Sequence, residues 1–113
     1  MKTKTADIAG RALDWAVCKA QGIEYVERFC VDAAGQEHEA TNPSTNWAHG
    51  GPIIEREHIS TYPDPCDDMP EIKWSADSPD VYRCGGPTPL VAAMRCFVAS
   101  RLGDEVDIPE ELT

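Results

Sequence analysis

The clearest hydrophobic periodicity in the chain lies near its C-terminus, in the segment TPLVAAMRCFVASRLG. Large apolar residues recur there at helical spacing, and most of the remaining positions are Ala or Cys, as expected of a helix buried on most sides. Thr88 suits the N-cap, Pro89 suits the first helical position, and Gly103 is a natural C-terminal stop. The pattern predicts a helix over residues 88–102 at the centre of the core.

A second apolar stripe at helical spacing lies in the segment IAGRALDWAVCKAQG and predicts a helix over residues 9–21. The stripe consists of Ala9, Leu13, Ala16, Val17 and Ala20. Gly22 follows as a C-terminal stop. Arg11 and Asp14 are expected on the outer face of this helix, and Trp15 flanks the buried stripe.

Segments typical of β-strands follow the first helix. Residues 23–32, IEYVERFCVD, are rich in Tyr, Val, Phe and Ile and predict one strand of about eight residues. Residues 33–36 are expected to form a turn, and residues 37–40 to return as the second strand of a hairpin. Residues 41–46, TNPSTN, form a loop by composition.

The segment PIIEREHISTY, residues 52–62, shows neither a clear helical nor a clear strand period. Pro52 suits the first position of a short helix, and an extended segment is the alternative. We expect a short helical turn that leads into a strand near residues 59–62. A proline-rich loop follows at residues 63–70.

Two further short strands are expected before the last helix. Residues 71–76, EIKWSA, predict the first of them, and residues 77–80, DSPD, are typical of a turn. Residues 81–84, VYRC, are a second short strand or an extended approach to the helix.

The order of helices and strands predicts an α+β fold. We expect a small, mostly antiparallel sheet packed by two main helices, at about residues 9–21 and 88–102. A chain of 113 residues is one domain, 1–113, with a single modest core. Residues from about 104 form an acidic C-terminal tail, in which Val106 and Ile108 are expected to pack back on the domain.

Acidic residues outnumber basic ones by 20 to 10, which gives a formal net charge of −10. Direct binding of DNA or RNA needs clustered Lys and Arg, so this balance argues against nucleic acid as a partner, and equally against an anionic membrane surface. No segment is long and apolar enough to span a membrane, and no signal peptide follows Met1, so we expect a cytoplasmic location in the host cell. The acidic surface is also compatible with DNA mimicry, in which carboxylates imitate phosphates.

The five cysteines are Cys18, Cys30, Cys66, Cys84 and Cys96. Their number is odd and no pair has Cys-x-x-Cys spacing, so free thiols are expected in a reducing cytosol, with Cys18 and Cys96 in the core. The histidines form no closely spaced ligand pair with the cysteines, so no metal or other cofactor is predicted. Cys84 and His49 could meet in space, but nothing in their spacing requires a catalytic pair, and no catalytic residue is assigned.

Two segments that share Gly-Gly-Pro are the most distinctive parts of the chain: STNWAHGGPIIERE and GGPTPLVAAMRCFVASRLGDEVDIPEEL. Together with AGRALDWAV in the first helix, they make the chain similar to the NinX-like proteins of lambdoid phages and prophages, a family catalogued as a domain of unknown function. Members often carry Tyr-Ser-Pro-Ser-Thr before the tryptophan motif, where this chain has ATNPST, which implies an altered loop. The resemblance implies a phage or prophage origin among accessory early genes and brings no activity with it.

The same two segments contain the candidate binding residues. A Gly-Gly pair lets a ligand approach the backbone, and before a helix it can aim N–H groups at an anion, although GGPTPL is neither a Walker nor a dinucleotide motif. Tryptophan can stack on a base, histidine can donate to a phosphate, and arginine can supply positive charge. The candidate ligand-binding residues are Trp47, His49, Gly50, Gly51, Arg56, Gly85, Gly86, Thr88 and Arg95. The structural alternative is a rigid corner, a helix cap and ordinary surface ion pairs.

Arg95 is the most informative of these residues, because it lies in an otherwise apolar helix, where a buried guanidinium needs a carboxylate or a bound anion. We therefore hypothesise a non-enzymatic binding module that sequesters a nucleotide-type host signal and so counters host defence. The alternative is a protein-binding modulator or DNA mimic that acts on a host enzyme, and a third hypothesis is a nucleotide-processing enzyme. A homo-oligomer is also considered, because a subunit interface would add depth to the pocket of so small a chain.

Overall fold

A computed structural model of the chain describes residues 1–26, 29–31, 34–39, 41–81 and 83–112. Over these residues the predicted α+β class is confirmed. The helices are α1 (Gly10–Ala20), α2 (Trp47–Arg56) and α3 (Pro89–Leu102), with short 3-10 helices η1 (Thr5–Asp7) and η2 (Glu110–Leu112). The strands are β1 (Lys2–Lys4), β2 (Glu24–Val26), β3 (Phe29–Val31), β4 (Glu37–Glu39), β5 (Ser60–Pro63), β6 (Trp74–Asp77), β7 (Cys84–Gly86) and β8 (Glu105–Asp107).

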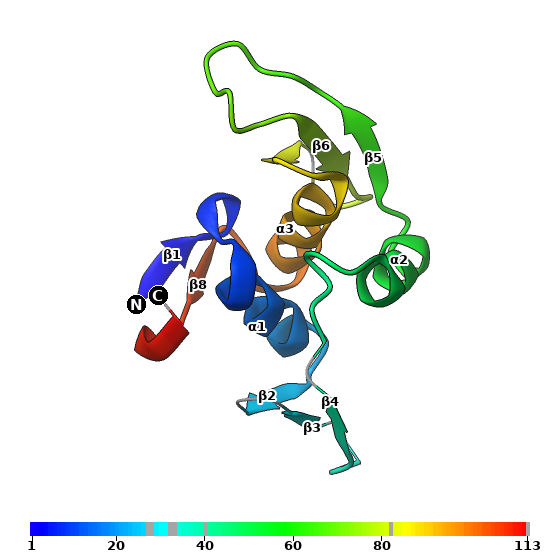
Figure 1. Cartoon of the computed structure of the whole chain (residues 1–113), viewed down its shortest axis with the longest axis vertical. Helices are drawn as coiled ribbons and strands as arrows, with labels where there is room; N and C mark the ends of the chain where they lie inside the picture. Colours follow the sequence, from blue (N-terminus) through cyan, green and yellow to red (C-terminus); the bar gives the residue numbers. More distant parts are fainter. Residues whose placement is uncertain (27–28, 32–33, 40, 82, 113) are drawn as a thin grey trace.

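The described strands form three separate antiparallel sheets, where the sequence predicted one. β1 pairs with β8, β2, β3 and β4 form a second sheet, and β5, β6 and β7 form a third. Figure 1 shows these sheets on different sides of the helices, with α3 between the sheet of β5, β6 and β7 and the pair of β1 and β8. Helix α3 packs against the sheet of β5, β6 and β7 and also against α1 and α2, so the core of this protein is organised around α3.

Helix α3 occupies the position that its sequence predicts. All nine residues from Leu90 to Val98 are buried. The hydroxyl oxygen of Thr88 accepts a hydrogen bond from the backbone N–H of Val91 at 3.1 Å, which confirms the N-cap. Gly103 follows the last helical residue with a φ of 88°, a conformation that glycine adopts without strain.

Helix α1 also confirms its prediction, with two exceptions: Asp14 is buried, and Ala9, expected in the apolar stripe, is the exposed N-cap residue. Leu13, Ala16 and Val17 are fully buried against the core. Asp14 was expected on the outer face, but it is buried, and its carboxylate accepts the backbone N–H of Ser44 at 2.9 Å. The loop before α2 lies over this side of α1, and helical periodicity cannot reveal that a distant loop will cover a polar position.

The prediction of a single strand over residues 23–32 is wrong, because this segment folds into two strands. β2 and β3 pair antiparallel with each other, and Tyr25 lies opposite Cys30. The charged residues 27 and 28 fall between the two strands and lie outside the described residues. The return strand is confirmed, since β4 pairs with β3 within residues 37–39.

Helix α2 begins five residues earlier than the sequence predicted. The side-chain oxygen of Asn46 caps it by accepting the N–H of Ala48 at 2.9 Å, so Trp47 is the first helical residue. Pro52 therefore lies inside the helix and not at its first position. The expected strand near residues 59–62 is confirmed as β5, which covers residues 60–63.

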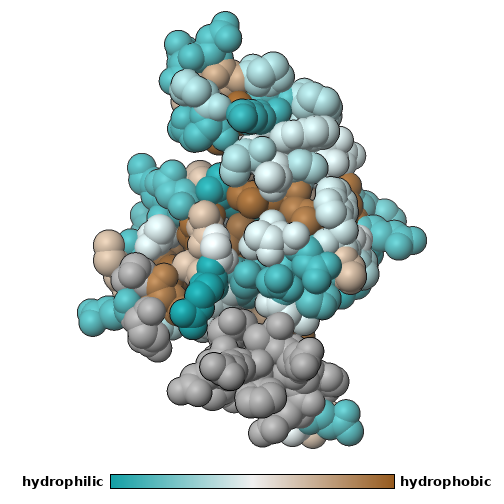
Figure 2. All heavy atoms as spheres, in the orientation of Figure 1, coloured by the Kyte–Doolittle hydropathy of each residue, from teal (hydrophilic) through white to brown (hydrophobic). Residues whose placement is uncertain are grey.

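The strand expected over residues 81–84 lies further along the chain, where β7 includes Gly85 and Gly86. The acidic tail forms β8, whose pairing with β1 was not predicted, because the sequence alone does not show that the two ends of the domain meet. Val106 and Ile108 are buried as expected. Figure 2 shows a mostly hydrophilic face on which hydrophobic residues are visible in the middle.

Candidate functional site

The two Gly-Gly-Pro segments meet in the structure through Gly50. A Cβ atom at this position would lie 2.6 Å from Cδ2 of Leu90, at the start of α3, and 2.5 Å from the backbone oxygen of Pro43. Since real Cβ atoms do not approach other atoms so closely, glycine at position 50 is what allows α2 to pack against α3. The meeting point is therefore filled by protein atoms.

The glycines of the second segment have a similar packing role. A Cβ at Gly86 would lie 2.8 Å from the backbone nitrogen of Ala92, and a Cβ at Gly85 would lie 2.9 Å from Ile72. Gly51 differs from the others, because the nearest atom to its hypothetical Cβ is a ring carbon of Trp47 at 4.0 Å. Thr88 uses its hydroxyl oxygen as the cap of α3.

Trp47 and His49 lie on α2. The side chain of Trp47 is 54% exposed, which makes it one of the most exposed large apolar residues in the described part of the chain. Nδ1 of His49 accepts the backbone N–H of Asn42 at 3.1 Å, and this bond ties the imidazole ring to the loop before α2. Trp47 is thus available to a partner, whereas His49 has a clear structural role.

Arg56 lies at the end of α2 in a small network of charges. Its guanidinium donates to the carboxylate of Glu57 at 2.9 Å, and Arg101 donates to the other oxygen of that carboxylate at 2.7 Å. Both guanidinium groups also lie over the ring of Phe97, at 6.0 and 5.5 Å from its centre. The hydrogen bond from Arg101, and to a smaller extent that from Arg56, lowers the pKa of Glu57. The carboxylate of Glu57 therefore neutralises one of the two positive charges.

Arg95 is buried, with an exposed fraction of 8%. Its Nε donates to the backbone oxygen of Ile8 and its Nη1 donates to the backbone oxygen of Gly85, both at 2.8 Å. Within the described residues no carboxylate lies within ion-pair distance of this guanidinium. The pKa of Arg95 is lowered, because burial disfavours the charged guanidinium. The attraction of Asp7 acts in the opposite direction but is weaker. The side chain therefore joins the N-terminal segment to β7 while its charge lacks a close counter-ion.

A cavity of about 420 Å³ lies beside Arg95, between η1 and the sheet of β5, β6 and β7. We call it the Ile72 cavity. Its walls include the polar side chains of Asp7, Asp64 and Arg83. They also include the apolar side chains of Met69 and Ile72 and the backbone of Gly85. The backbone oxygen of Gly85, which accepts from Arg95, belongs to this wall, so the guanidinium lies behind it.

Arg83 forms the rim of the Ile72 cavity. Its guanidinium donates to the carboxylate of Asp64 at 3.1 Å, and the hydroxyl of Ser75 donates to the same oxygen at 2.8 Å. The φ of Arg83 is 55°, which is uncommon for a residue with a side chain, and its backbone N–H donates to Asp77 at 2.7 Å. Strained residues of this kind cluster at functional sites, so Arg83 is a candidate that the sequence did not suggest.

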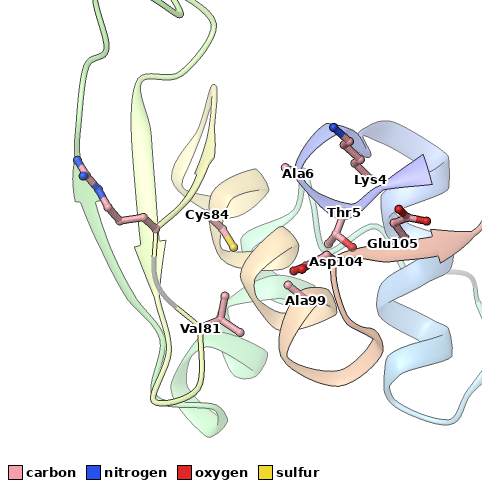
Figure 3. Close-up of a pocket in the computed structure, with 9 residues that line it drawn as sticks. Lys4, Thr5, Ala6, Val81, Cys84, Ala99, Asp104 and Glu105 are labelled. Atoms are coloured by element: carbon pink, nitrogen blue, oxygen red, sulfur yellow. The ribbon is translucent and has the colours of Figure 1, made fainter. Parts of the chain in front are cut away.

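A second cavity, of about 320 Å³, shares Ala6 and Arg83 with the first. Figure 3 shows that Cys84 points into it from β7, towards α3, while Asp104 and Thr5 approach from the opposite side. The hydroxyl of Thr5 donates to the backbone oxygen of Gly103 at 2.7 Å. We call this the Cys84 cavity.

The predicted binding residues are therefore distributed over three places. Arg95 and Gly85 adjoin the Ile72 cavity, Arg56 lies in the charge network with Phe97, and Trp47 is on the exposed side of α2. Sequence reasoning missed Asp7, Asp64, Ser75 and Arg83, which come from separate elements. The one sequence signal for any of these residues was that Arg83 lies two residues before the Gly-Gly pair.

No helix among the described residues is long and apolar enough to cross a membrane. Over the same part of the chain, no group of three or more His, Cys, Asp or Glu residues could hold a metal ion.

Comparison with protein families adds one finding. A family model described as "Bacteriophage P22, NinX" matches residues 4–101, which include all three α-helices except the last residue of α3. A search of curated proteins found no match to the chain.

Proposed function

Because the chain belongs to the phage NinX family, we propose that it is a small, non-enzymatic binding module that sequesters a nucleotide-type signal in the host cytoplasm. The observation that carries this proposal is the buried guanidinium of Arg95, which has no close carboxylate partner in the described part of the chain and lies behind the wall of the Ile72 cavity. Removal of such a molecule from the host would counter a defence that depends on it.

The charge of Arg95 favours an anionic ligand. A buried charge is unfavourable unless it is paired, and the bonds to two neutral carbonyl oxygens satisfy donors without neutralising it. Asp7 attracts the guanidinium from beyond ion-pair distance, and a phosphate in the Ile72 cavity would add a second negative charge on the other side of the Gly85 wall. Arg83 at the rim could move from Asp64 to the same phosphate, since its side chain is 72% exposed.

The remaining walls favour a ligand that carries more than a phosphate. A volume of about 420 Å³ lies within the usual range for small-molecule sites, roughly 300–1,000 Å³. Pro65, Met69 and Ile72 provide apolar surface for a base, whereas Asp7 and Asp64 can accept from its amino groups. The same two carboxylates repel phosphate, whether it is free or part of a nucleotide. Only a nucleotide also gains contacts between its base and these walls, so it suits the cavity better than inorganic phosphate.

Calorimetry against mono-, di- and cyclic nucleotides tests the proposal, with inorganic phosphate and pyrophosphate as controls. We expect saturable binding of at least one nucleotide class and weaker binding of phosphate alone. Flat traces for every nucleotide would remove this function. Catalytic turnover that is lost on changing His49 or Cys84 would indicate the enzyme hypothesis instead.

Two variants locate the site without disturbing the core. Arg83→Asn removes the rim charge, and asparagine tolerates a positive φ better than most residues. Arg56→Gln is the matched control, since it removes another exposed arginine that does not line the Ile72 cavity. Nucleotide affinity should fall about tenfold or more in Arg83→Asn, the usual scale for one charged hydrogen bond, and stay unchanged in Arg56→Gln. Equal loss in both variants would place the ligand elsewhere.

The second candidate function is a protein-binding modulator or DNA mimic of a host enzyme. It is supported by the exposed indole of Trp47, because aromatic residues commonly anchor protein interfaces, and by the net charge of −10. Affinity purification from host lysate, with Trp47→Ala as the comparison, tests it. A stoichiometric, salt-sensitive partner that the variant fails to retain would favour this function over the first.

The oligomeric state remains a prediction. The Ile72 cavity is built from one chain, so nucleotide binding as proposed here does not require a second copy. Sedimentation with and without nucleotide measures the state directly, and a dimer that forms only with nucleotide would show that a subunit interface completes the site.

A further inference from the structure

Two cysteines from different elements face each other where β7 runs back along α3. A Cβ at Gly86 would lie 2.8 Å from the backbone nitrogen of Ala92, and Arg95, three residues after Ala92, donates to the backbone oxygen of Gly85, the residue before Gly86. Cys84 lies two strand residues before Gly86, or about 7 Å, and Cys96 lies four helical residues after Ala92, or about 6 Å. Both cysteines are therefore displaced by nearly the same distance from the Gly86–Ala92 contact.

The side chains also point to the same side. Residues two apart in a strand share a face, as do residues four apart in a helix, so Cys84 and Cys96 project into the layer between β7 and α3. Each thiol shifts the pKa of the other, as expected of two sulfurs that lie close together in this layer. The sulfur of Cys96 additionally lies 3.8 Å from the backbone oxygen of Val81.

The interaction between the two thiols shifts their pKa values in opposite directions. It raises the pKa of Cys84, whose thiol is more stable while it donates, and it lowers the pKa of Cys96, whose thiolate it stabilises. Burial raises the pKa of both thiols, because it disfavours the charged thiolate. A thiolate at Cys96 can therefore accept the proton of Cys84 when the Cys84 sulfur attacks another group.

Access from solvent distinguishes the two sulfurs. Cys96 is fully buried, whereas Cys84 is partly exposed and lines the Cys84 cavity, where Figure 3 shows its sulfur pointing inwards. A small oxidant can thus reach Cys84 first, and Cys96 is already in place to react with the product.

We propose that Cys84 and Cys96 form a reversible disulfide site whose oxidant is a small-molecule disulfide such as oxidised glutathione. The Cys84 sulfur attacks one sulfur of the oxidant, gives its proton to Cys96 and releases one glutathione as a thiolate. The released thiolate takes this proton from Cys96, whose sulfur then attacks the mixed disulfide at Cys84 and releases the second glutathione as a thiolate. The second thiolate is protonated from solvent, to which Cys96 had lost its own proton before the first step. In sum, two protein thiols and one oxidised glutathione give one protein disulfide and two reduced glutathione molecules.

This site is independent of the nucleotide proposal, because it needs only the two thiols and the open side of Cys84. Its product would join β7 covalently to α3, close to Arg95 and the wall of the Ile72 cavity. Oxidation would therefore fix the spacing of the two elements that position the Arg95 guanidinium.

The experiment is a native incubation of the folded protein with oxidised glutathione, followed by alkylation of the remaining thiols, intact mass measurement and peptide mapping. Cys66→Ser serves as the background, because the partly exposed thiol of Cys66 would otherwise compete for the oxidant. We expect the main product to lose two hydrogen atoms, to carry no glutathione, and to yield a peptide that links residues 84 and 96.

Two variants separate the steps. In Cys96→Ser we expect glutathione to remain on Cys84, whereas in Cys84→Ser we expect both the linked peptide and the reaction to be lost, because Cys96 is buried. The proposal is overturned if the background protein, with both thiols present, keeps a stable glutathione on Cys84 or leaves both thiols free for alkylation. Reduction by dithiothreitol should restore the starting mass.

Discussion

Gly50 and Leu90 lie so close together that a Cβ at position 50 would be 2.6 Å from Cδ2 of the leucine. The same Cβ would be 2.5 Å from a backbone oxygen, that of Pro43, which cannot move away as a side chain can. This contact joins the two Gly-Gly-Pro segments, and it explains the first glycine of the pair as a packing residue.

Alanine in place of each of the two adjacent glycines of α2 should therefore change the free energy of unfolding in opposite directions. Gly50→Ala is expected to lower the free energy of unfolding by about 2–3 kcal/mol, because the added methyl overpacks the contact with α3. Gly51→Ala meets only ordinary contact at 4.0 Å, and alanine should stabilise the helix by about 0.5–1 kcal/mol. Urea unfolding of the two variants measures both, and equal effects would contradict the packing described here.

Arg95 should contribute to stability through its two carbonyl bonds. Arg95→Met leaves the oxygens of Ile8 and Gly85 without this donor, and we expect a loss of about 2–4 kcal/mol in the free energy of unfolding. Arg101→Met is the control, since its exposed ion pair with Glu57 should be worth about 0–1 kcal/mol. Chemical denaturation of both variants measures the two losses in the free energy of unfolding. A small loss in Arg95→Met would show that other groups satisfy these oxygens.

The carboxyl group of Asp14 makes stability depend on pH. Burial raises its pKa in the folded protein above the ordinary value of 3.8, so the folded state binds the proton more tightly than the unfolded state. The contribution of Asp14 to stability is therefore largest below pH 3.8 and falls as the pH rises through the folded pKa. Asp14→Asn retains an acceptor for the N–H of Ser44, and its stability relative to the original protein should rise across this window.

Glu57 provides the control of opposite sign for the pH measurement. Hydrogen bonds from Arg101 and Arg56 lower its pKa below 4.5, so its contribution is present above that pH and is lost as the pH falls through the folded pKa. Glu57→Gln should be less stable than the original protein near neutrality, and the difference should shrink in acid. Unfolding midpoints recorded from about pH 3 to 7 would reveal both trends, and a pH-independent difference for Asp14→Asn would refute the assignment.

The N-cap of α3 is a local contact that can be removed by itself. Thr88→Ala deletes the acceptor for the N–H of Val91 and should cost about 1 kcal/mol of stability. Thr88→Ser keeps the hydroxyl and should stay close to the original protein. A nucleotide titration of Thr88→Ala serves as a second readout, since loss of affinity beyond the loss of stability would indicate that the hydroxyl also contacts the ligand.

The sequence by itself determined the features that depend on neighbours along the chain. The helices α1 and α3, the cap at Thr88, the stop at Gly103 and the loop before α2 follow from spacing and from local hydrogen bonds. Local signals also misled where they were weak: Pro52 resembled a helix start, although Asn46 had already capped the helix.

Only the tertiary structure decided which distant residues meet. The burial of Asp14 under Ser44, the contact of Gly50 with Leu90 and the pairing of Arg83 with Asp64 join positions 19 to 40 residues apart. For the same reason Trp47 and Arg95, both candidates from one pair of motifs, have different surroundings: the indole is exposed to solvent, and the guanidinium is buried behind the wall of a cavity. Periodicity and capping are properties of a few consecutive residues, whereas a binding cavity is formed by the packing of elements that the chain order does not place side by side.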